Sequence, residues 1–185
     1  VPVVALVAVP HLIAALSHWY DVPVPPDTVF GSSDPDPWMR LTLVRDWLQG
    51  GGWYDHLVHH SDAPFAAISS PWTRPVDVLI AGLVWLQPET VELSTRLMRA
   101  ALLVPWLAMT LLLFGLLRTI RAICPLRSAQ FWGVALMASS PMMWSYFGLA
   151  NADHHGVLAA CFMWLMAFVL DEKQRAGHAV GAGVL

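Results

Sequence analysis

Residues 100–117, AALLVPWLAMTLLLFGLL, contain no charged side chain and are typical of a membrane-spanning helix. Such a helix needs about 20 mostly apolar residues to cross the hydrocarbon core of a bilayer. The whole chain has the same character, because 57% of its residues are hydrophobic, 12% are charged and its mean hydropathy is +0.56. Soluble domains carry about 25% charged residues. The sequence therefore predicts an all-α integral membrane protein.

Three further apolar segments are interpreted as membrane spans, which gives a polytopic helical bundle of about four spans. They are residues 1–18, residues 129–150 with Pro141 inside, and residues 156–170. Residues 179–185 are expected to begin a fifth span, so we expect the chain to be the N-terminal part of a larger protein. Residues 76–87 are apolar but too short to cross, and they fit a short interfacial or re-entrant helix.

The charges of the connecting segments predict how this bundle is oriented. Residues 118–128 carry three Arg and no acid, whereas residues 19–75 carry seven Asp and three Arg. Cytoplasmic loops are enriched in Lys and Arg. We therefore expect residues 118–128 and 171–178 in the cytoplasm, and a long loop, residues 19–99, and a short one, residues 149–155, at the outer face.

The whole chain, residues 1–185, is thus interpreted as a single transmembrane domain. Its expected location is a bacterial inner membrane, with the outer loops on the periplasmic side. The net charge of −3 provides no basic surface for nucleic acid, so no nucleic-acid partner is expected. Membrane lipids are expected partners.

Two polar motifs fall on the predicted outer face although they are far apart in sequence. The first is Asp36-Pro37-Trp38 followed by Arg40, where Pro37 suits the first turn of a helix that ends before three glycines at 50–52. Asp36 on its own is equally well explained as the N-cap of that helix. The second motif, residues 151–156, is Asn-Ala-Asp-His-His-Gly between two predicted spans.

Asp and His side chains at a membrane boundary are suitable ligands for a divalent metal ion. Asp36 and Asp153 from the two outer loops are therefore candidates to meet at one cation, although Asp153 alone is compatible with simple exposure to solvent. Trp72 and Arg74 precede the short apolar helix. They fit either an interfacial anchor or a contact to a phosphate.

These motifs resemble the catalytic subunit of oligosaccharyltransferase, a family of the GT-C membrane glycosyltransferases. The Asp36-Pro37-Trp38 motif is similar to the family's first outer-loop motif. Residues 139–156 are similar to a span that leads into the family's Asp-x-Asp or Asp-x-Glu motif. The resemblance implies that sugar is transferred from a polyprenyl-phosphate-linked donor to a protein or glycan acceptor at the outer face.

Particular roles follow from the resemblance. Asp36 is expected to be catalytic, touching both acceptor and metal, and Asp153 and His155 are expected to complete the metal site. Arg40, Trp72, Arg74 and His154 are expected to bind substrate. The family's later outer-loop Glu and its Trp-rich acceptor motif would lie beyond Leu185, so the active site is expected to be incomplete in this chain.

His155 departs from the family pattern, because it stands where a second acid is usual. A divalent ion, Mn²⁺ or Mg²⁺, is the expected cofactor, but imidazole favours Mn²⁺ or Zn²⁺ over Mg²⁺ and leaves open a site without metal. Two other functions remain as alternatives. A transporter requires ionisable residues inside the spans, of which His11 is almost the only example. A non-catalytic membrane scaffold requires none of these roles.

Overall fold

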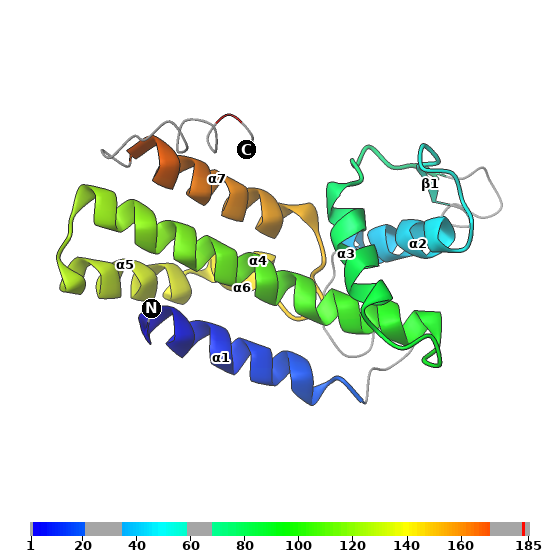
Figure 1. Ribbon diagram of the computed structural model, residues 1–185, viewed down its shortest axis with the longest axis horizontal. Helices are drawn as coiled ribbons and strands as arrows, with labels where there is room; N and C mark the ends of the chain where they lie inside the picture. The colour runs from blue at the N-terminus through cyan, green and yellow to red at the C-terminus, as the bar shows by residue number, and fades with distance from the viewer. Residues whose placement is uncertain (1, 21–34, 59–67, 171–182, 184–185) are drawn as a thin grey trace.

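The computed structural model describes residues 2–20, 35–58, 68–170 and 183, and these are predominantly helical (Figure 1). The helices are α1 (Pro2–Ser17), α2 (Asp36–Leu48), α3 (Pro75–Trp85), α4 (Leu93–Ile123), α5 (Arg127–Ser139), α6 (Pro141–Tyr146) and α7 (His154–Leu170). Two short strands, β1 (Leu57–Val58) and β2 (Ile68–Ser69), pair in antiparallel fashion. The prediction that helices dominate the fold is confirmed.

Helix α4 connects two packed regions of the molecule. Its first half packs with α2 and α3 around Val44, Ile80 and Leu102. Its second half packs with α1, α5 and α7 around Leu113 and Val134. Figure 1 shows the result: a long bundle formed by α1 and α4–α7, with α2 and α3 gathered at one end.

The prediction of about four spans is not supported by the described residues. Among them, α4, with 31 residues, is the helix that is long and apolar enough to cross a membrane. Helices α1 and α7 have 16 and 17 residues, which is short of the roughly 20 required. The predicted span over residues 129–150 is broken between α5 and α6. Ser140 there has φ −68° and ψ 132°, because the ring of Pro141 disfavours a helical conformation in the preceding residue.

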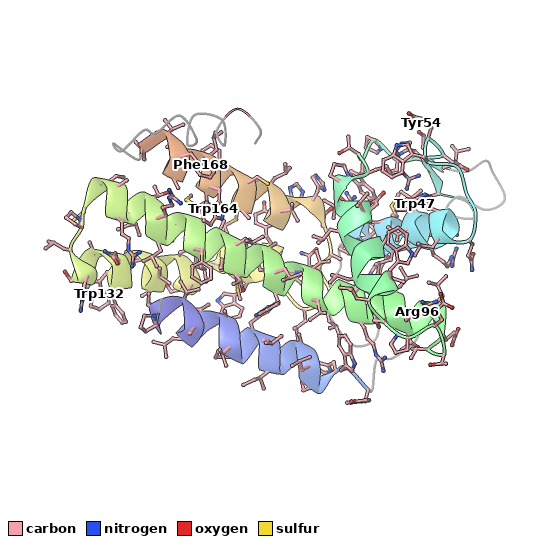
Figure 2. All side chains as sticks on the ribbon, in the orientation of Figure 1. Trp47, Tyr54, Arg96, Trp132, Trp164 and Phe168 are labelled. Carbon is pink, nitrogen blue, oxygen red and sulfur yellow. The ribbon has the colours of Figure 1, made fainter. Side chains whose placement is uncertain are left out.

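Large apolar side chains lie exposed along the outside of the long bundle. The exposed fractions include 69% for Leu6 on α1, 63% for Trp132 on α5 and 58% for Leu158 on α7; Figure 2 shows Trp132 near the end opposite α2 and α3. Extended apolar surface is uncommon on soluble monomers. Together with the length of α4, this surface is consistent with membrane association.

Helix α2 differs from its prediction at one end and agrees at the other. The N-cap is Pro35, Asp36 is the first helical residue, and no side chain caps the helix. The interpretation of Asp36 as the capping residue is therefore wrong. The predicted end is confirmed, because α2 stops at Leu48 and Gly50 has φ +103°, a left-handed conformation that favours glycine.

The short apolar segment over residues 76–87 forms α3, as a helix of 11 residues. It packs against both α2 and α4, and Ile80 and Ala81 are completely buried. Of the predicted cytoplasmic loops, residues 171–178 lie outside the described part of the chain. So does the predicted fifth span, apart from Gly183.

Candidate functional site

Arg40, on α2, lies at the centre of a buried ionic cluster. Its guanidinium Nη1 is 2.7 Å from Oδ1 of Asp77 on α3, and its Nη2 is 3.6 Å from Oδ1 of Asp153 at the start of α7. The Trp72 ring covers the guanidinium at 4.8 Å from its centroid. Arg40 and Asp77 are 1% exposed and Asp153 is 4% exposed. Side chains from three separate elements therefore meet at one site that is shielded from solvent.

Asp77 joins a second arginine to this cluster. Its Oδ2 accepts a hydrogen bond from Nη1 of Arg74 at 3.0 Å, one helical turn earlier. Arg74 also donates from Nε to the carbonyl of Trp53 at 2.9 Å and from Nη2 to the carbonyl of Asp55. Through Arg74, the cluster fixes the chain segment that leads from α2 to β1.

The four buried charges balance, since two arginines face two aspartates. An unpaired charge is costly to bury, whereas a paired and hydrogen-bonded one is tolerated. This balance explains how Arg40, Arg74, Asp77 and Asp153 can all lie in the interior. It also ties α2, α3 and α7 to one relative arrangement.

Asp153 and the two histidines that follow it form the more open side of the cluster. Oδ1 of Asp153 is 2.6 Å from Nδ1 of His154, and its Oδ2 is 3.5 Å from Nε2 of His155. The second distance is that of a loose ion pair and is too long for a good hydrogen bond. Oδ2 of Asp153 is buried and has no hydrogen-bond partner in the described part of the chain.

The turn before α7 places these three residues. Ala150 takes the left-handed conformation, with φ 60°, and the amide of the Asn151 side chain donates to the carbonyl of Ser145. Ala152 is completely buried against the α2–α3–α4 core. This anchoring directs Asp153 into the interior, while His155, whose side chain is 49% exposed, lies against the ring of Tyr146 at 5.3 Å.

The donor set of Asp153, His154 and His155 fits a divalent transition metal. One ligand atom from each residue can be chosen so that all three lie within 4.8 Å of one another. Imidazole and carboxylate together suit Mn²⁺ or Zn²⁺. The buried Oδ2 without a hydrogen-bond donor is an oxygen that such an ion would satisfy.

The structure brings most of the predicted site residues together. Arg40, Asp153 and His154 are in contact, since Nη2 of Arg40 is 3.5 Å from Nδ1 of His154. The ring centroids of Trp72 and His154 are 6.3 Å apart. Asp36 precedes Arg40 by four residues, which places it on the same side of α2 one turn away. The roles assigned to these residues stay predictions.

The two predicted substrate-binding arginines have protein partners in the structure. Arg40 contacts two aspartates, and Arg74 contacts one aspartate and two backbone carbonyls. Asp77, which joins them, was not predicted as a site residue. The signal for it was present, because Asp77 is the one acid in the apolar residues 76–87 and follows Arg74 by three positions.

Comparison of the chain with protein-family models, curated proteins and solved structures finds no match.

Proposed function

We propose that this chain belongs to a membrane glycosyltransferase that uses a polyprenyl-phosphate-linked sugar donor. The observation that carries the proposal is the meeting of α2 and the start of α7 at Arg40 and Asp153, 3.6 Å apart. These segments contain the two motifs that resemble the oligosaccharyltransferase catalytic subunit. The proposed acceptor is a protein or a glycan, and the proposal specifies no particular sugar.

The position of the cluster suits a substrate that is anchored in a membrane. The long bundle carries exposed apolar side chains, and the ionic cluster lies at the end of the bundle where α2 and α3 gather (Figure 1). In the proposal, α1, the α5–α6 pair and α7 lie in the membrane beside α4, with the cluster at the outer, periplasmic face. A lipid-linked sugar would then meet the polar site at the membrane surface.

The residues of the cluster have proposed roles that follow from their contacts, and the role of Asp36 follows from the resemblance. A divalent ion would be held by Asp153, His154 and His155. Such an ion would stabilise the negative charge that develops on the departing phosphate. Asp36 would approach the acceptor hydroxyl or amide and orient it. Arg40 and Arg74 are assigned as positioning residues, because their guanidinium groups are occupied by Asp77, Asp153 and backbone carbonyls.

The proposal is tested with the full-length protein in native membranes, supplied with a radiolabelled polyprenyl-diphosphate sugar and Mn²⁺. We expect Asp153→Asn to lower sugar transfer by about 100-fold or more, as loss of a group that stabilises developing charge does. Asp46→Asn is the matched control, since Asp46 lies on α2 but pairs with Arg45 in an exposed position. Unchanged transfer by Asp153→Asn, or an equal loss in both variants, would contradict the proposal.

A further inference from the structure

A hollow lies directly beside the ionic cluster, and the proposed roles leave it without a function. It has a volume of about 580 Å³, within the range of about 300–1,000 Å³ that is usual for small-molecule sites. Its walls come from the segment after α2 and the segment before α3. Figure 2 shows Tyr54, from its rim, at the outer edge of the α2–α3 region.

The lining of the hollow combines aromatic faces with hydroxyl groups. The lining includes three aromatic residues, three hydroxyl residues and two further polar residues: Trp53, Tyr54, Trp72, Ser69, Ser70, Thr73, Asp55 and His56. Tyr54 is 88% exposed and Trp53 is 42% exposed, so both rings are accessible to a ligand. The electron-rich face of such a ring attracts the weakly positive hydrogens of an apolar C–H surface.

This chemistry favours a carbohydrate over an anion. A pyranose ring presents C–H groups on its faces and hydroxyls around its edge, which match rings and side-chain hydroxyls respectively. The buried cation at the hollow, Arg74, has its guanidinium directed to the carbonyls of Trp53 and Asp55 and to Asp77. A phosphate entering the hollow would therefore have to compete with three existing interactions.

Two of the three rings of the aromatic wall, those of Trp53 and Trp72, have packing partners before any ligand binds. The Trp53 ring packs edge-on against Trp47 at a centroid distance of 5.2 Å, and its carbonyl is fixed by Arg74. A site that is already ordered loses less conformational freedom on binding. Trp72 is shared between the two sites, since it lines the hollow and also covers Arg40.

We propose that this hollow is a binding subsite for neutral sugar residues of the glycan, next to the ionic centre where transfer would occur. The proposal rests on the glycosyltransferase function and adds the substrate class that the site recognises. Trp72 lines the hollow and its ring centroid lies 6.3 Å from that of His154. The sugar residues held in the hollow would therefore lie next to the ionic centre, while another residue of the same glycan would carry the reacting bond.

The test is direct binding of the full chain, in nanodiscs, to a printed array of neutral and acidic oligosaccharides. Nanodiscs are used because the head groups of maltoside detergents are themselves sugars. We expect saturable binding to neutral glycans, and we expect Tyr54→Ala to weaken it about threefold to tenfold, which corresponds to the loss of one aromatic contact. Tyr54→Phe keeps the ring and should remain within about threefold of the native chain.

Tyr20→Ala is the matched control, since Tyr20 is 87% exposed and lies after α1. Binding to no glycan on the array, equal binding by Tyr54→Ala and the native chain, or displacement of the glycan by millimolar inorganic diphosphate would overturn the proposal. The two proposals are separated by their own variants, because Asp153→Asn should lower transfer by about 100-fold or more, whereas Tyr54→Ala should weaken array binding. If the glycosyltransferase proposal alone is wrong, Tyr54-dependent binding persists without any transfer.

Discussion

Asp77 is the residue on which the ionic cluster depends most. Its two carboxylate oxygens each accept from a different buried arginine, at 2.7 Å and 3.0 Å. Its removal leaves two guanidinium groups without their shared counter-ion in the interior. Such a loss is far more costly than the loss of an exposed ion pair.

We expect Asp77→Asn to lower the free energy of unfolding by about 3–5 kcal/mol. Asp46→Asn, in the exposed pair with Arg45, should lower it by less than about 1 kcal/mol. Thermal unfolding of the two purified variants in one detergent, followed by circular dichroism, measures the difference. Similar losses in the two variants would show that the Arg40–Asp77–Arg74 cluster does not stabilise the fold.

The sequence predicted the two halves of this site but not the residue between them. Asp36, Arg40 and Asp153 were found because polar motifs between apolar segments are conspicuous and because loop charges placed both on one face. Asp77 was not predicted because residues 76–87 were interpreted from their apolar character and length as an interfacial or re-entrant helix, without regard to the acid among them. The partner of such an acid is set by three-dimensional packing, which neither periodicity nor spacing reveals.

At the level of elements, helix positions were predicted better than helix lengths. The existence of α2, α3, α4 and α7 followed from apolar blocks and from the glycines after α2. The break between α5 and α6 did not, because a proline inside an apolar block either kinks a helix or ends it, and the surrounding packing determines which occurs.

The contact between α4 and α7 depends on a small residue. A Cβ atom at Gly115 would lie 3.2 Å from the backbone of Met163, whereas a Cβ atom at Gly82 on α3 would meet nothing within 4 Å. The Thr119 hydroxyl, which bonds the carbonyl of Gly115 at 2.9 Å, also lies 3.3 Å from the carbonyl of Met163. Small residues allow such close approach of apolar helices.

The same substitution at these two glycines should therefore have opposite effects. Gly82→Ala should raise the free energy of unfolding by about 0.5–1 kcal/mol, because alanine favours the helix and has room. Gly115→Ala should lower it by about 1 kcal/mol or more, because the methyl group pushes α7 away from α4. The measurement is the shift in midpoint temperature of each variant, and a rise in both would contradict the close packing of α4 on α7.

For the whole molecule, the distribution of charge predicts how the proposed membrane bundle is oriented. The ionic cluster is at one end of the bundle, and the turn between α4 and α5 is at the other (Figure 1). The segment around that turn carries Arg118, Arg121 and Arg127. Because arginines in short loops remain on the cytoplasmic side, the cluster should face outward.

The two native cysteines provide labels for this orientation. Cys124 lies at the turn between α4 and α5, and Cys161 lies within α7. We expect a membrane-impermeant maleimide to label Cys124 in inverted vesicles but not in intact spheroplasts. With both cysteines replaced by serine, Glu89→Cys, before α4, should show the reverse pattern. Labelling of Cys124 from outside would place the cluster on the cytoplasmic side and remove it from the face at which a glycosyltransferase of this type is proposed to act.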